Sequence, residues 1–201
     1  MPNYCSNSLA VSGHPFLMKE FMDSYTNEGH FDFAKITPMP SDEELLEMGT
    51  NSYDWSIKNW GQKWYIDQAD WEDWDDYSYS AIFDTAWGPC IPVILKLIEL
   101  CPGLDFKFKY HESGCAFLGW IYASNGEIYD DYEISYSESP EAYWYHMFEK
   151  EYESYDWLED TLEEAHDCEN ITDEQYQELQ DSLENDNLEL VIEKFIRYDI
   201  L

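Results

Sequence analysis

The fold class of this chain is decided by residues 81–110, AIFDTAWGPCIPVILKLIELCPGLDFKFKY. The run Ala81–Ala86 predicts a strand, the apolar residues from about Pro92 to Leu100 predict a helix, and Asp105–Tyr110 predicts a second strand. Glycine and proline in WGPC and CPG separate the three elements. We therefore expect a βαβ unit in the middle of the chain.

The chain on both sides of this unit predicts more of the same sheet. Upstream, Ser6–Val11 predicts a short strand and Pro15–Ser24 a helix. Downstream, about Cys115–Ala123 and Glu127–Ser135 predict two strands, joined by an Asn-Gly pair that accommodates the positive φ of a tight hairpin turn. The expected fold class is α+β, with helices that cross over a sheet.

Residues 37–80 predict a surface insertion in a core that spans residues 1–138. Ser41 and Glu44 form a capping-box pattern for a short helix that Gly49 ends. Residues 51–80 mix five Trp with seven acids and two Lys, and they predict only weak strands, at Trp64–Ile66 and Tyr77–Ser80.

From Ser139 to residue 201 the pattern is helical. Ser139 is a predicted N-cap, followed by Pro140 at the first helical position. Thr172 and Gln175 predict the start of a second helix, and about Leu188 to Arg197 a third. An apolar stripe steps by three or four along the first helix: Phe148, Tyr152, Tyr155, Leu158, Leu162 and Ala165. We expect a separate acidic α-helical region at residues 139–201.

Net charge is the property that most narrows the possible classes of function. The 201 residues contain 10 Lys and Arg against 44 Asp and Glu, a net charge of −34, whereas a small domain needs only about 2 to 8 charges for solubility. Such a field repels nucleic acid and anionic lipid and speeds encounter with cationic surfaces. The sequence predicts a protein that binds a basic partner, with no direct nucleic-acid contact and no membrane contact.

Two acidic clusters are the candidate partner-binding surface. The first steps 4, 3, 4, 3, 4 along one predicted helix and contains Glu149, Glu153, Asp156, Asp160, Glu163 and Asp167. Its members lie about 5 Å apart along the helix axis, of the same order as phosphates along a DNA strand. The second contains Asp70, Glu72, Asp73, Asp75 and Asp76. The alternatives are an ordinary solvated helix face for the first cluster and diffuse counterion attraction for the second.

Catalytic and metal-binding motifs were sought, and none of GxSxG, GxxxxGK[ST], GxGxxG, HExxH or an EF-hand loop occurs. We therefore expect a protein that is not an enzyme and that has no cofactor or metal. The best nucleophile candidate is Cys115, which His111 could activate across a turn. Five cysteines without a CxxC pair favour reduced thiols, and the start of the chain lacks signal-peptide features, so we expect a cytoplasmic protein.

Three stretches carry a family resemblance: MPNYCSNSLAVSG at 1–13, NWGQKW at 59–64, and FDTAWGPC through GEI at 83–128. Together they resemble an uncharacterised family of phage and plasmid proteins with ferredoxin-like domains, although Tyr4 stands where that family has Trp and Cys90 where it has Pro. The resemblance covers about residues 1–135 and implies a ferredoxin-like antiparallel sheet without an established activity. On this basis the helices after residue 138 look like an addition. Asn3, Trp60, Gly61, Trp64, Trp87 and Pro89 are expected to be framework residues.

A phage or plasmid origin also implies a class of function by analogy, because acidic proteins of mobile elements often inhibit host defence by imitating DNA. The leading hypothesis is an inhibitor, in the host cytoplasm, of a basic host protein that binds nucleic acid, such as a restriction or CRISPR effector. Two alternatives stay open: a small enzyme or modifier that uses Cys115 and His111, and a structural or regulatory phage protein-interaction module.

Overall fold

The computed structural model describes residues 3–66, 69–150, 155–168, 170–184 and 187–201. Contacts between Cα atoms divide the chain into two units, Met1–Glu133 and Ile134–Leu201, which we call the sheet unit and the helical unit. Each is described by itself. The predicted domain boundary near residue 138 stays a prediction.

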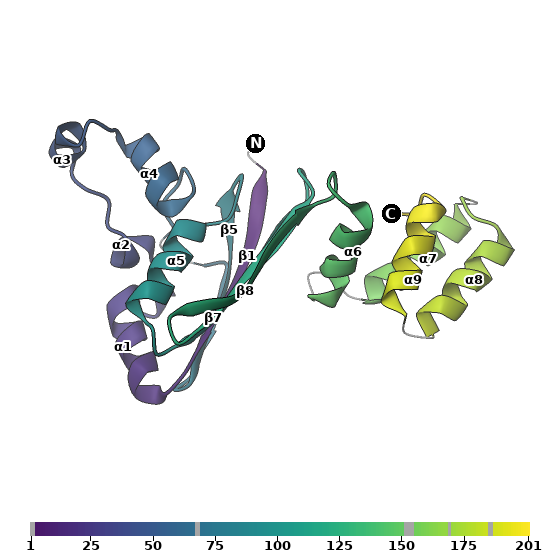
Figure 1. Cartoon of the computed structure of the whole chain (residues 1–201), viewed down its shortest axis with the longest axis horizontal. Coiled ribbons are helices and arrows are strands. Elements are labelled where there is room, and N and C mark those ends of the chain that lie inside the picture. Colours follow the sequence, from purple (N-terminus) through teal and green to yellow (C-terminus); the bar gives the residue numbers. More distant parts are fainter. Residues whose placement is uncertain (1–2, 67–68, 151–154, 169, 185–186) are drawn as a thin grey trace. The chain divides into compact units, whose positions relative to one another are not determined.

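The sheet unit is built on a six-stranded antiparallel sheet with the strand order β4-β5-β1-β6-β7-β8 (Figure 1). Its strands are β1 (Tyr4–Ser12), β4 (Trp71–Trp74), β5 (Ser78–Ala86), β6 (Asp105–Glu112), β7 (Phe117–Ser124) and β8 (Glu127–Ser135), with a separate small hairpin of β2 (Thr26–Asn27) and β3 (His30–Phe31). Its helices are α1 (Pro15–Tyr25), α2 (Phe33–Ile36), α3 (Asp42–Glu47), α4 (Ser52–Trp60) and α5 (Ile91–Leu100).

The pairing of β1, a central strand, explains the order and direction of its neighbours in the sheet. β1 pairs antiparallel with β5 on one side and with β6 on the other, so β5 and β6 run parallel to each other and α5 is the crossover between them. This confirms the predicted βαβ unit and the α+β fold class, with β1 inserted between the two parallel strands. The turn at Asn125 and Gly126 has φ of 54° and 76°, as the predicted tight hairpin requires.

One face of the sheet is covered by α1 and α5 (Figure 1). Alternate residues of β1 are buried because side chains of a strand point to opposite faces. The largest fully buried side chains include Phe21 of α1, Ile94 of α5, Phe83 of β5 and Phe108 of β6, which belong to one core cluster. Helices therefore pack on the strands through a continuous aromatic and aliphatic layer.

Residues 37–80 are only partly the insertion that the sequence predicts. The capping box at Ser41 and Glu44 begins α3 as predicted. However, β4 pairs with β5, and β5 itself begins at Ser78, so the end of this segment belongs to the main sheet. The strand predicted at Trp64–Ile66 is wrong, and the helix α4 was missed because its pattern is hidden among aromatic and acidic residues.

Three sequence motifs that are far apart meet beside the ends of β1 and β5. Asn7 Nδ2 donates to Thr85 Oγ1 at 2.8 Å, the Ala86 amide donates to Gln62 Oε1 at 3.3 Å, and the Trp87 amide donates to the Asn3 carbonyl at 3.0 Å. Asn7 and Gln62 are each 1% exposed. Hydrogen bonds between the resemblance motifs thus link β1 and β5 to each other and to the loop after α4.

The expected framework residues divide into two groups. Trp60 is buried, and a Cβ on Gly61, whose φ is +79°, would lie 2.9 Å from the Pro89 carbonyl oxygen, so these positions are framework as predicted. Trp64 and Trp87 are 42% and 59% exposed, so their side chains lie partly in solvent, and their framework role stays a prediction.

The helical unit contains α6 (Pro140–Glu149), α7 (Tyr155–Asp167), α8 (Asp173–Glu184) and α9 (Leu188–Arg197). Ser139 caps α6, Thr172 and Gln175 exchange capping hydrogen bonds at the start of α8, and Asn187 caps α9. α9 packs against α6 and α8, and α7 packs against α8. The predicted helices after Ser139 are confirmed, except that the first is two helices.

Candidate acidic binding surface

α7 has one buried side and one acidic side. Leu158, Leu162 and Ala165 are buried, which confirms these members of the predicted apolar stripe. The thirteen residues of α7 include six carboxylates and neither Lys nor Arg. All six are exposed: Asp156, Glu159, Asp160, Glu163, Glu164 and Asp167. We call these six residues the acidic face of α7.

The predicted carboxylate stripe does not run along a single helix. α6 ends at Glu149, where the Lys150 amide bonds the carbonyls of His146 and Phe148 and so closes the last turn. Glu149 therefore belongs to α6, and its side chain lies outside the described part of the structure. Glu153 also lies outside the described residues. The other four predicted members, Asp156, Asp160, Glu163 and Asp167, lie together on α7.

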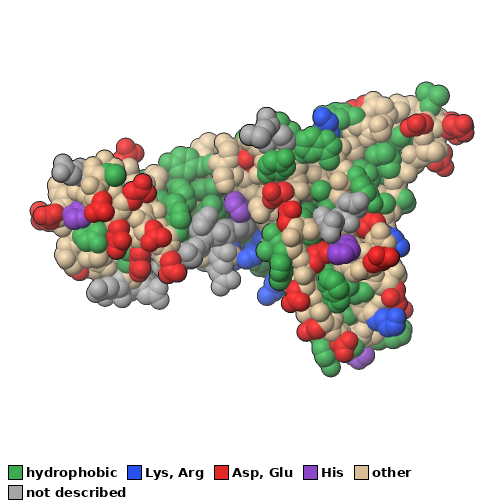
Figure 2. Space-filling view, turned by 180° about the vertical axis from the view of Figure 1, so that it is seen from behind, with side chains coloured by type: hydrophobic (Ala, Val, Ile, Leu, Met, Phe, Trp, Pro, Cys, Tyr) green, Lys and Arg blue, Asp and Glu red, His purple; other side chains and the backbone are tan. Residues whose placement is uncertain are grey.

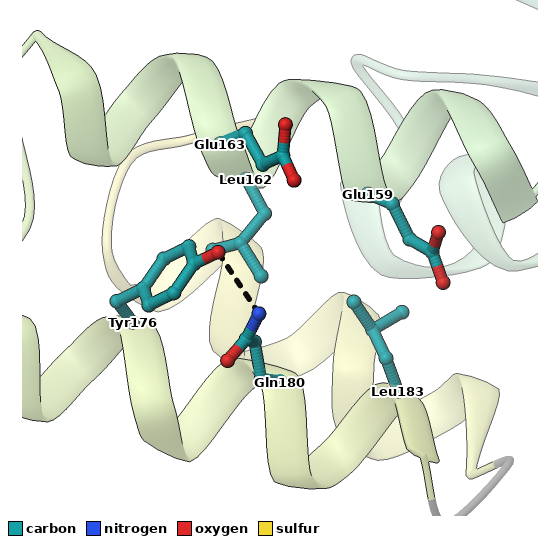
Figure 3. A pocket seen from close by; sticks show the side chains of 6 residues that line it. All are labelled: Glu159, Leu162, Glu163, Tyr176, Gln180 and Leu183. Atoms are coloured by element: carbon teal, nitrogen blue, oxygen red, sulfur yellow. Dashed lines mark hydrogen bonds between the residues drawn. The ribbon is translucent and has the colours of Figure 1, made fainter.

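A small groove lies between α7 and α8, beside the acidic face (Figure 3). Its volume is about 230 Å³, and Glu159, Leu162 and Glu163 of α7 and Tyr176, Gln180 and Leu183 of α8 line it. Figure 3 shows side chains from both helices extending into this space, with Gln180 Nε2 donating to the Tyr176 hydroxyl at 2.9 Å. Leu162 is 2% exposed and forms part of an apolar floor. The groove thus combines an apolar floor with two carboxylates on its rim.

The sequence alone does not show that the six residues lining the groove lie together, although it shows two pairs of them. Glu159 and Glu163 are one turn apart on one helix, as are Tyr176 and Gln180 on the next. Each pair is visible in the sequence. The packing of α7 against α8, which brings the pairs together, is not.

Two cations of the helical unit are held by acids of α8 and α9. Lys194 Nζ lies 3.0 Å from Glu178 Oε1 and donates to Ser182 Oγ at 2.8 Å, and Arg197 pairs with Glu193. Tyr198 also donates to Glu178, at 2.8 Å. Lys194 thus joins α9 to α8, whereas Arg197 pairs within α9, so the printed partners of both cations lie outside the acidic face of α7. The face of the helical unit seen in Figure 2 accordingly shows many carboxylates.

One member of the second predicted cluster, Glu72, is buried in the sheet unit. Glu72 has a side chain that is 4% exposed and accepts hydrogen bonds from the Phe31 amide at 2.6 Å and the Tyr79 hydroxyl at 2.7 Å, with His30 Nδ1 at 2.6 Å. Asp75 accepts from the amides of Tyr77 and Ser78 and shapes the turn into β5, which lowers its pKa. Both carboxylates therefore serve the fold.

Asp70, Asp73 and Asp76 are exposed, and so is Asp75. Asp70 Oδ2 accepts from the Asp84 amide at 3.1 Å, whereas Asp73 and Asp76 lie at the solvent side of β4 and the turn after it. Four of the five carboxylates therefore lie on the surface of the sheet unit, and their role in partner binding stays a prediction.

The surroundings of Cys115 oppose activation of its thiol as a nucleophile. Its amide donates to Glu112, and its Sγ accepts from Asn3 Nδ2 at 3.7 Å. A hydrogen bond between the Cys115 thiol and the Glu112 side chain, together with the negative charge of that carboxylate, raises the pKa of the thiol above its ordinary value. A nucleophilic cysteine needs the opposite shift. The neighbour that controls this thiol is thus Glu112, and the pairing with His111 stays an alternative from the sequence.

Among the residues that the structure describes, no helix is long and apolar enough to cross a bilayer. Within the same residues, no three side chains from His, Cys, Asp and Glu come together as metal ligands.

The fold and the surface together define a class: an α+β domain with a six-stranded antiparallel sheet, continued by acidic helices. The chain belongs to the family described as the ferredoxin-like domain in Api92-like protein, whose model matches residues 67–178. No curated protein matches the chain. A crystal structure of a protein api92 from Yersinia pseudotuberculosis is similar at 8% identity, with a TM-score of 0.47, over 67% of this chain and 99% of that one.

The family match corrects one expectation from the sequence. The helices after residue 138 look like an addition to the resembling core, but the matched region runs to residue 178 and so includes α6, α7 and the first half of α8. The acidic face of α7 therefore lies within the family's domain.

Proposed function

We propose that this protein binds a basic protein through the acidic face of α7. The observation that carries the proposal is that six exposed carboxylates occupy one thirteen-residue helix that has neither Lys nor Arg. Like charges one turn apart destabilise an isolated helix by about 0.2 to 0.5 kcal/mol per pair. A cationic partner surface removes this repulsion, and its approach is accelerated by the net charge of −34.

The partner in this proposal is a host defence protein that binds nucleic acid, and the effect is inhibition. A surface built for phosphates presents Lys and Arg at intervals of several ångströms, and carboxylates on successive turns of α7 recur about every 5 Å along the helix axis. The resemblance to phage and plasmid proteins supports this class of partner by analogy.

Recovery of partners from a host lysate tests the proposal. Asp156→Lys with Asp160→Lys reverses two charges on α7, and Glu127→Lys with Asp131→Lys reverses two exposed charges on β8 as a matched control. We expect the wild type and the β8 variant to recover a nucleic-acid-binding protein at low salt and to lose it at high salt. The α7 variant should recover none.

The same experiment separates the alternatives. Equal recovery by all three proteins would show that α7 is not the binding surface. Recovery of virion components instead of a host protein would favour a structural or regulatory phage module. Inhibition of the captured protein's nucleic-acid binding at one-to-one stoichiometry would favour a binder over a modifying enzyme.

A further inference from the structure

The groove between α7 and α8 has the size and chemistry for one long side chain. At about 230 Å³ it is smaller than the roughly 300 to 1,000 Å³ of most small-molecule sites. Leu162 and Leu183 supply apolar surface for methylene groups, and Glu159 and Glu163 supply negative charge at the rim (Figure 3). Long cationic side chains combine these two properties, since they bury an aliphatic stem while the charged end stays near polar groups.

We propose that this groove is a socket for a single arginine side chain of the basic partner, an inference that rests on the proposed function. The guanidinium group is planar and weakly hydrated, and its five N–H donors can serve two carboxylates at once. Glu159 and Glu163 present two carboxylates one helical turn apart. Tyr176, on the opposite helix, lines the same groove, and aromatic rings attract guanidinium groups.

The groove is pre-formed by contacts that do not involve its carboxylates. Gln180 holds the Tyr176 hydroxyl at 2.9 Å, and the Tyr176 ring stacks on the His166 ring with the centroids 4.2 Å apart. His166 in turn contacts Asp173 at 2.9 Å, near the start of α8. Because Tyr176 is fixed from two sides, a ligand would not have to order this side chain on binding, which favours affinity.

Lysine fits the same place less well. Its ammonium is a compact and strongly hydrated charge that cannot span two carboxylates with a rigid fork. The socket therefore predicts selectivity for arginine, whereas a merely acidic surface predicts equal binding of arginine and lysine at equal charge.

Calorimetric titration of the full chain with two probes tests this inference: acetylated and amidated hexa-arginine and hexa-lysine, at one low salt concentration. We expect hexa-arginine to bind the wild type about tenfold more tightly than hexa-lysine, because charge-assisted bidentate hydrogen bonds are available to it alone. Glu159→Gln with Glu163→Gln should abolish this preference. Asp156→Asn with Asp160→Asn removes the same charge from α7 outside the groove, and should weaken both peptides while it keeps the preference.

The outcomes distinguish the two proposals. If both peptides bind the wild type equally, or if the groove variant keeps the preference, the socket is wrong while the acidic surface stands. If neither peptide binds the wild type, both proposals fail. As a second readout, the methyl resonances of Leu162 and Leu183 should shift on addition of hexa-arginine, whereas those of Leu118 in the sheet unit should not. Unchanged resonances at Leu162 and Leu183 would also overturn the socket.

Discussion

At the scale of single residues, carboxylates of similar sequence context have different roles. Glu72 and Asp73 are neighbours on β4, yet Glu72 is buried among three hydrogen-bond partners and Asp73 is exposed. Burial raises the pKa of Tyr79, and the hydrogen bond to Glu72 raises it further, which keeps the phenol protonated as a donor. The alternation of a strand explains this difference, since adjacent residues face opposite sides of the sheet.

Glu72→Ala should lower the free energy of unfolding by about 3 kcal/mol, because it leaves the Phe31 amide and the Tyr79 hydroxyl without their acceptor. Urea denaturation followed by fluorescence measures the change. Asp73→Ala is the matched control and should change stability by less than about 0.5 kcal/mol. Equal effects of the two substitutions would contradict the assignment of Glu72 to the fold.

Trp87 adopts a backbone conformation that bulky residues rarely use, with φ of +71° and a side chain that is 59% exposed. Trp87→Gly should leave the free energy of unfolding unchanged or raise it by up to about 1 kcal/mol, because glycine relieves the left-handed strain. Trp60→Ala, at a buried indole, should instead cost about 3 to 5 kcal/mol. A large loss for Trp87→Gly would show that its indole packs against the protein.

At the scale of elements, α9 is joined to α8 by Glu178, which accepts from Tyr198 and pairs with Lys194. The hydrogen bond from Tyr198 and then that from Lys194 lower the pKa of Glu178 below its ordinary 4.5. A carboxyl whose pKa is lower in the folded state stabilises the protein above its ordinary pKa. This contribution is lost as pH falls through the folded pKa.

At pH 7, the Glu178→Gln variant should therefore have a Tm about 2 °C below that of the wild type. At a pH well below 4.5, the two proteins should have the same Tm. Tyr198→Phe removes the other end of the hydrogen bond, and the double substitution should cost less than the sum of the two. A Tm difference that persists at low pH would show that the carboxylate is not the stabilising group.

At the scale of the whole molecule, the net charge of −34 opposes folding, because carboxylates repel one another more when the chain is condensed. Raising NaCl from about 0.1 M to 1 M shortens the screening length from about 10 Å to about 3 Å. The Tm should therefore rise with NaCl, by about 5 °C over this range. A variant with four α7 carboxylates changed to the corresponding amides should show a smaller increase of Tm with NaCl. A Tm that falls with salt would mean that favourable ion pairs outweigh the repulsion.

Local patterns were sufficient to predict many elements. The periodicity of 81–135 predicts β5, α5, β6, β7 and β8, and the caps at Ser41, Ser139 and Thr172 mark helix starts that the structure confirms. They succeed because a capping bond or an alternating strand depends on residues a few positions apart. They fail at α4 and β4, where buried and exposed tryptophans are mixed and the partner strand decides the assignment.

By itself, the sequence determined the fold class, the charge and the placement of an acidic face on a helix after Ser139, because these follow from composition and short-range periodicity. Only the tertiary structure decided which carboxylates serve the fold and which face solvent. It separated Glu72 from Asp73, placed Glu149 on a different helix from Asp160, and joined Glu159 and Glu163 to Tyr176. Each of these depends on contacts between residues distant in the chain, which local patterns do not specify.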